Sequence, residues 1–97
     1  MVKHIVLWNI IEGLDKEETI LNLRKKLTAL VGQVPTLRKL EIGANYNDKP
    51  SGHDVCLYTE FDDAAGLAAY IVHPLHKEVG LYVKRVVCDR ADSDYVI

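Results

Sequence analysis

The chain has 97 residues, a length that suits one domain, here residues 1–97, with a modest core of its own. Twelve Lys and Arg residues stand against fourteen Asp and Glu residues, which leaves a formal net charge of -2. No basic stripe stands out, so the composition argues against a nucleic-acid partner. The sequence shows no signal peptide and no apolar run long enough for a membrane span. We therefore expect a cytoplasmic protein in which Cys56 and Cys88 are buried, reduced thiols.

Residues 2–11 predict a first strand that is apolar on both faces. One face consists of alternate positions of this segment: Val2, His4, Val6, Trp8 and Ile10. The other face includes Ile5, Leu7 and Ile11. A strand that is apolar on both faces has to be covered on both sides.

Residues 16–31 predict an amphipathic helix. Asp15 occupies the N-cap position, and Glu18 follows three residues later in the position of a capping box. The apolar stripe recurs at spacings of three and four residues, at Ile20, Leu23, Leu27 and Leu30. Gly32 suits a C-terminal cap and Pro35 forbids continuation, so the helix is expected to end before them.

Residues 37–46 and 53–61 predict two strands joined by a short polar loop, which favours an antiparallel hairpin. A second helix is predicted over residues 64–72, capped by Asp62 or Asp63.

The His73-Pro74 pair ends this second helix, because the residue before a proline is pushed out of the helical region. Pro74 suits the first position of a third helix, and apolar residues then recur at helical spacing as far as Val86. Residues 89–97 predict a final short strand.

The predicted order of strand, helix, strand, strand, helix, helix and strand is that of a ferredoxin-like fold. The expected fold class is α+β, with a four-stranded antiparallel sheet whose helices lie on one face. The outer face, which carries Ile5 and Leu7, would then remain an exposed apolar patch. The sheet of a second copy is an economical cover, so we predict a homodimer that forms a dimeric α/β barrel.

Five short segments of the chain form an ordered set: Lys3-His4-Ile5-Val6, Gly43-Ala44-Asn45, His73-Pro74-Leu75-His76, Asp89-Arg90-Ala91 and Asp94-Tyr95. Together they resemble the stress-responsive dimeric α/β-barrel (Dabb) domain family, over essentially the whole chain. The resemblance implies the same ferredoxin-like dimer. One branch of that family, the plant polyketide cyclases, closes a ring on a linear polyketide by aldol chemistry without a metal.

The residues that this branch uses fall on His4, Tyr70 and His76. The resemblance therefore implies a catalytic set with His76 as base, Tyr70 as donor to an enolate oxygen, and His4 as an orienting or second acid–base group. Histidine suits proton removal and tyrosine stays protonated, because their unperturbed pKa values are about 6.5 and about 10. The chain departs from the family at Asp92 and Ser93, where apolar residues are usual.

Each histidine candidate also has a structural explanation, which for His76 is a position on the protein surface. His4 could be a core histidine bonded to a backbone carbonyl, and His73 could simply cap the helix that starts at Pro74. His73 and His76 have the helical spacing of a metal site, but no carboxylate or cysteine clearly completes the set. We therefore predict neither a metal nor another cofactor.

Three functions remain open. The first is a metal-free lyase or cyclase acting on a small hydrophobic carbonyl compound. The second is a non-catalytic, stress-related ligand-binding or structural dimer. The third is a cofactor-independent monooxygenase.

The expected binding site discriminates between the first two functions. Trp8, Leu27 and His73 are predicted to contact the substrate. An enzyme should gather the catalytic residues around one cavity of roughly 300 Å³ or more. In a structural dimer, Trp8 or Leu27 would fill that space.

Overall fold

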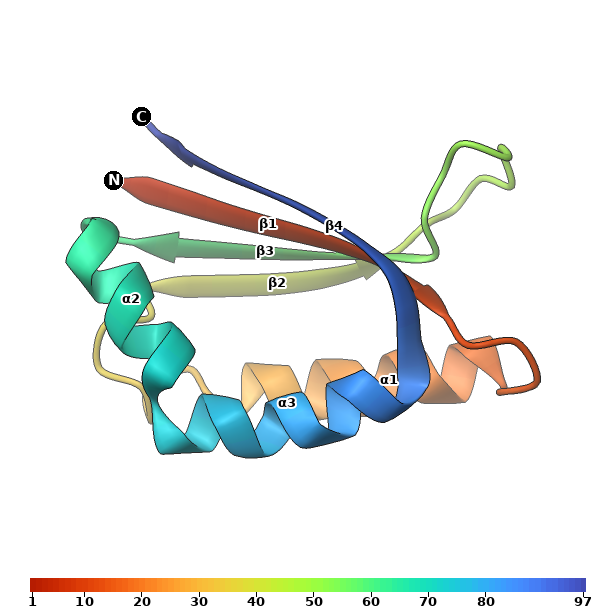
Figure 1. The fold of residues 1–97 in the computed structure, drawn as a ribbon, viewed down its shortest axis with the longest axis horizontal. Helices are drawn as coiled ribbons and strands as arrows, with labels where there is room; N and C mark the ends of the chain where they lie inside the picture. The colour runs from red at the N-terminus through yellow and green to blue at the C-terminus, as the bar shows by residue number, and fades with distance from the viewer.

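Four strands form one antiparallel sheet in the order β2-β3-β1-β4, and three helices lie on one of its faces (Figure 1). The structure is a computed structural model that describes residues 1–97, with these elements: β1 (Val2–Ile10), α1 (Lys16–Thr28), β2 (Lys39–Ala44), β3 (Val55–Phe61), α2 (Ala64–Val72), α3 (Pro74–Val86) and β4 (Val87–Val96). β1 pairs with β3 on one side and with β4 on the other. This arrangement confirms the predicted ferredoxin-like α+β fold.

The helices begin where the predicted caps place them. Asp15 accepts a hydrogen bond from the backbone N–H of Glu18 at 3.0 Å at the start of α1. Of the two candidates for the second cap, Asp63 is the residue that accepts a backbone N–H, at 2.8 Å. His73 separates α2 from α3 in extended backbone, and Pro74 is the first residue of α3. None of the helices combines the length and apolarity that a membrane-spanning helix needs.

Several elements end a few residues away from the predicted boundaries. Helix α1 stops at Thr28 because the chain tightens into turns there, before Gly32 adopts a φ of 85°. Strand β4 starts earlier than predicted, at Val87, because its first residues pair with Asn9 and Ile10 of β1. Backbone pairing to a distant strand therefore sets this boundary.

The first and last strands bring the two ends of the chain together (Figure 1). The backbone N–H of Ile97 donates to the carbonyl oxygen of Met1 at 3.0 Å. The ladder continues inward along both strands, with His4 opposite Asp94. Residues from opposite ends of the sequence are thus fixed side by side.

The core lies between the sheet and the helices. Alternate residues of β1 face this core and are buried, as predicted: Val2, His4, Val6, Trp8 and Ile10. Leu23 of α1 and Phe61 of β3 are completely buried in the same cluster. The helices are therefore held to the sheet by a continuous apolar layer.

The opposite face of the sheet carries apolar side chains that no helix covers. Ile5 and Leu7 of β1 pair with Tyr58 and Cys56 of β3, and all four are only half-buried. This surface matches the one predicted to meet a second copy of the chain.

The prediction that both cysteines are buried is wrong. Cys88 is exposed because it lies on β4, an edge strand with no neighbour beyond it. Cys56 is half-buried on the outer face of the sheet, and burial raises the pKa of its thiol. Neither cysteine forms a disulfide.

We predict that Leu23→Ala lowers the free energy of unfolding by about 2–5 kcal/mol, because it removes a completely buried side chain. Urea denaturation followed by circular dichroism measures the change. Leu21→Ala is the matched control, since Leu21 lies on the same helix with 45% of its surface exposed. Equal losses in the two variants would contradict the assigned core.

Candidate functional site

A cavity of about 470 Å³ opens between the sheet and helices α2 and α3. Sixteen residues line it, and ten of them are hydrophobic, so it suits a largely apolar guest. The lining includes the three predicted catalytic residues, His4, Tyr70 and His76. It also includes Trp8 and Leu27, which therefore form part of the wall and leave the space open.

Tyr70 lies on α2 with its ring packed between two other rings. The ring centres of Tyr70 and Phe61 are 5.1 Å apart, and those of Tyr70 and His76 are 4.3 Å apart. The Tyr70 hydroxyl is buried, yet no protein group forms a hydrogen bond with it. Burial raises the pKa of Tyr70 to about 12, so the hydroxyl keeps its proton at neutral pH. A protonated, unpaired hydroxyl keeps one hydrogen-bond donor unused.

His76 lies in the first turn of α3, where the backbone fixes its ring. Its Nδ1 atom is 3.1 Å from the carbonyl oxygen of Ile71. A carbonyl oxygen only accepts, so Nδ1 carries the proton and the neutral ring presents Nε2 as an acceptor. Burial lowers the pKa of His76 below its ordinary value of 6.5, and the charge of Arg90 acts in the same direction. At neutral pH the ring is therefore suited to act as a base.

His4 lies on β1 and pairs through Nδ1 with the carboxylate of Asp94. The two residues are opposite each other in the ladder between β1 and β4. The structural explanation of His4 predicted a hydrogen bond to a backbone carbonyl. In the structure the ring bonds to a carboxylate side chain instead. Because the carboxylate accepts at Nδ1, it fixes the orientation of the ring and leaves Nε2 available.

His73 does not line the cavity. Its Nδ1 atom accepts a hydrogen bond from the backbone N–H of Leu75 at 3.1 Å and so caps α3. Helix capping explains the presence of a histidine at this position, as the structural explanation of His73 predicted. Its contact with a substrate stays a prediction.

The sequence did not reveal three charged residues that also line the cavity, namely Lys84, Asp89 and Arg90. They lie close together in the chain, where α3 runs directly into β4 without a loop. Asp89 adopts a φ of 54°, and its carboxylate accepts a hydrogen bond from Asn9 Nδ2 at 3.1 Å. The Asp89-Arg90-Ala91 segment is one of those that carry the family resemblance, but nothing in it indicates which face of the sheet these side chains occupy.

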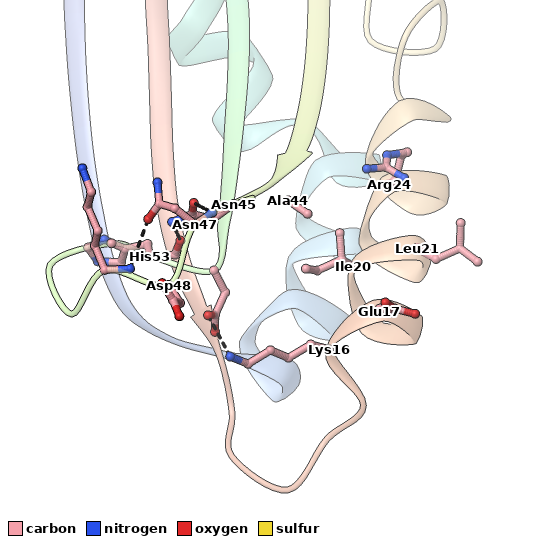
Figure 2. A pocket seen from close by; sticks show the side chains of 13 residues that line it. Lys16, Glu17, Ile20, Leu21, Arg24, Ala44, Asn45, Asn47, Asp48 and His53 are labelled. Carbon is pink, nitrogen blue, oxygen red and sulfur yellow. Dashed lines mark hydrogen bonds and ion pairs between the residues drawn. The ribbon is translucent and has the colours of Figure 1, made fainter.

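A second cavity, of about 650 Å³, lies between the start of α1 and the loop that joins β2 to β3 (Figure 2). Its lining is mostly polar, and these polar groups bond to one another. Lys16 Nζ is 3.0 Å from a carboxylate oxygen of Asp54, and Asn45 Nδ2 donates to the carbonyl oxygen of His53 at 2.7 Å. This cavity is larger, but its bonded polar groups leave less for a ligand to satisfy.

The chain contains no group of three or more His, Cys, Asp or Glu residues arranged to hold a metal ion. His73 and His76, which have the spacing of a metal site, instead bond to the backbone at Leu75 and Ile71.

The fold and the first cavity define a ferredoxin-like α+β domain with a ligand-sized, mostly apolar site between sheet and helices. Residues 2–97 match the family described as Stress responsive A/B Barrel Domain (Dabb), and the chain belongs to this family. The family resemblance noted in the sequence is thereby confirmed.

Relatives share the fold over nearly the whole chain. An uncharacterised protein of Streptomyces coelicolor is 31% identical over 96 residues, which cover 98% of each chain. A dimeric protein of unknown function with a ferredoxin-like fold from Bacteroides fragilis is 29% identical with a TM-score of 0.87, covering 99% of this chain and 95% of that one.

Two solved enzymes are more distant in sequence. A hydroxynitrile lyase from Passiflora edulis is 17% identical with a TM-score of 0.86, covering 99% of this chain and 92% of that one. An antibiotic biosynthesis monooxygenase is 17% identical with a TM-score of 0.78, covering 100% of this chain and 98% of that one. At this identity the likeness shows a common fold alone.

We predict that His76 titrates below its ordinary pKa of 6.5 because the folded protein buries the ring. The unfolded chain therefore binds this proton more readily than the folded protein does. The contribution of the neutral ring to stability is fully present above the unfolded pKa and is lost as the pH falls through the folded pKa. Nuclear magnetic resonance titration of the ring protons measures the midpoint, and His76→Gln assigns the signal. A midpoint at or above 6.5 would contradict the prediction.

Proposed function

We propose that the protein is a metal-free lyase or cyclase that binds a small hydrophobic carbonyl compound in the 470 Å³ cavity. One observation carries the proposal: the buried, unpaired hydroxyl of Tyr70 lies on a ring in contact with that of His76. A proton donor and a neutral base thus share one apolar cavity.

The proposed reaction begins with proton removal. Nε2 of His76 takes a proton from the carbon beside a carbonyl group. The electron pair of that C–H bond forms the C=C bond of an enolate, and the π pair of the carbonyl moves onto its oxygen. The Tyr70 hydroxyl donates a hydrogen bond to the resulting enolate. The enolate carbon then attacks a second carbonyl group, whose oxygen receives the proton back from His76.

His4 is the third member of the proposed catalytic set. The carboxylate of Asp94 holds its Nδ1 and thereby fixes the ring in the cavity wall. His4 can then orient the substrate or relay the proton to the second oxygen. Asp94 acts on the reaction through His4 and is a positioning residue.

A non-catalytic ligand-binding or structural dimer is the alternative, because the same cavity could hold a guest without chemistry. The likeness in fold to an antibiotic biosynthesis monooxygenase keeps a cofactor-independent monooxygenase as the second alternative. Oxygen consumption with a quinol would favour the monooxygenase. A cytoplasmic location and a role in stress also stay predictions.

We also infer that two copies pair through their sheets. The uncovered outer face carries the half-buried Ile5 and Leu7, and burying each side chain fully contributes roughly 1.5–3 kcal/mol. The Bacteroides fragilis relative, which shares this fold, is described as dimeric. A two-fold axis would set the same apolar surface against itself.

Leu7→Lys should convert the dimer into a monomer, because it places a charge on the apolar surface that the inferred dimer buries. Sedimentation velocity at micromolar concentration measures the mass. Leu21→Lys is the matched control, since Leu21 is an exposed leucine on α1, away from the sheet face, and this variant should stay dimeric. A monomeric wild-type protein would overturn the inferred assembly.

His76→Ala and Tyr70→Phe should each slow enolate formation by about a hundredfold or more, within the usual range for a lost general acid or base. The assay follows exchange of the α-hydrogens of methyl hexyl ketone in deuterium oxide by nuclear magnetic resonance. Val72→Ala is the control, because Val72 is an exposed residue of α2.

Stability separates a chemical effect from a damaged fold. Tyr70→Phe should unfold at the same urea concentration as the wild type or at a higher one, since it removes a buried hydroxyl without a partner. Retained exchange in both folded variants would reject the catalytic assignment and favour the non-catalytic alternative.

A further inference from the structure

Two cations line the proposed binding cavity near the junction of α3 and β4, beside the carboxylate of Asp89, although the rest of the lining is mostly apolar. Lys84 from the last turn of α3 and Arg90 from β4 both line it. The apolar part of the wall is formed by residues such as Trp8, Leu27 and Val79. A guest that filled the whole cavity would therefore meet a mostly apolar wall and, among the charged groups, two cations and one carboxylate.

The register of the sheet places the charged residues of β4 on the side of the helices. Asp92 is opposite Val6, and Asp94 is opposite His4; both partners are buried toward the helices. Arg90 lies two residues before Asp92, beside the irregularity in the pairing between Leu7 and Asn9, and it lines the cavity. The departure from an apolar strand at Asp92 thus lies on the helix side of the sheet, next to Arg90, which lines the cavity.

Two carboxylates nearby already accept hydrogen bonds from the protein. Asp94 pairs with His4, and the carboxylate of Asp89 accepts hydrogen bonds from Asn9 and from the Cys88 thiol.

The cations are less committed. Arg90 is 3.4 Å from Asp92, in a pair whose side chains are 56% and 47% exposed, and such exposed pairs are weak. Lys84 forms no ion pair. A ligand carboxylate could therefore recruit both cations while breaking only one weak interaction.

We propose that Arg90 and Lys84 form a subsite for a carboxylate, so that the substrate class is a medium-chain keto acid. The alkyl chain lies against the apolar wall, the carbonyl oxygen meets Tyr70, and the carboxylate meets the guanidinium of Arg90. The position of the ketone rests on the proposed function. The carboxylate subsite can be tested without any turnover.

Trp8 provides the readout, because it is the only tryptophan in the chain and lines the cavity. Three probes of equal chain length, octanoate, octanol and octylamine, are titrated while its fluorescence is followed. Octanoate should bind about tenfold more tightly than octanol, as expected for one hydrogen bond to a charged group, and octylamine should bind most weakly.

Arg90→Gln should lower the affinity for octanoate about tenfold and leave that for octanol unchanged. Lys84→Gln should act in the same direction. Asp92→Asn should raise the affinity for octanoate, because it removes the competing carboxylate. Lys77→Gln is the matched control, since Lys77 is an exposed cation of α3 outside the cavity lining, and it should change nothing.

Failure of this proposal is distinguishable from failure of the proposed function. Octanol or octylamine binding as tightly as octanoate, or no octanoate binding at millimolar concentration, would overturn the subsite. Ketone exchange that depends on His76 would still support the catalytic proposal in that case. Selective octanoate binding without ketone exchange would support the carboxylate subsite and contradict the catalytic proposal.

Discussion

The structure depends on the central position of β1 in the sheet. This strand pairs with β3 on one side and β4 on the other, so it has ladder partners along both edges. Because side chains alternate, one strand supplies both His4 and Trp8 to the cavity and both Ile5 and Leu7 to the outer face. The site and the proposed dimer surface are thus two faces of one element, and a shift of register by one residue would exchange them.

Most of the fold could be predicted because its signals are local. The caps at Asp15 and Asp63 and the break at Pro74 depend on neighbouring residues alone, and all three lie where the sequence indicated. The burial of Cys88 was predicted wrongly because it depends on strand order, which leaves β4 at the edge. Local composition around a residue does not report what lies beyond its strand.

The candidate site shows the same division. His4, Tyr70 and His76 could be placed on their elements by the family resemblance, and the fold brings them to one cavity. The bond from Asp94 to His4 joins residues 90 positions apart and follows from strand pairing. Arg90 depends in addition on an irregularity in that pairing between Leu7 and Asn9. Such long-range register has no signature in a single sequence.

The solitary hydroxyl of Tyr70 has a thermodynamic consequence for the whole domain. A buried donor without an acceptor leaves the native state less stable by about 1–3 kcal/mol than the same state with the bond made. Any guest whose oxygen completes that bond relieves the deficit as well as contributing its own contacts, and binding to the native state alone raises resistance to heat. Thermal-shift screening of a compound library would therefore rank oxygen acceptors above hydrocarbons of equal size.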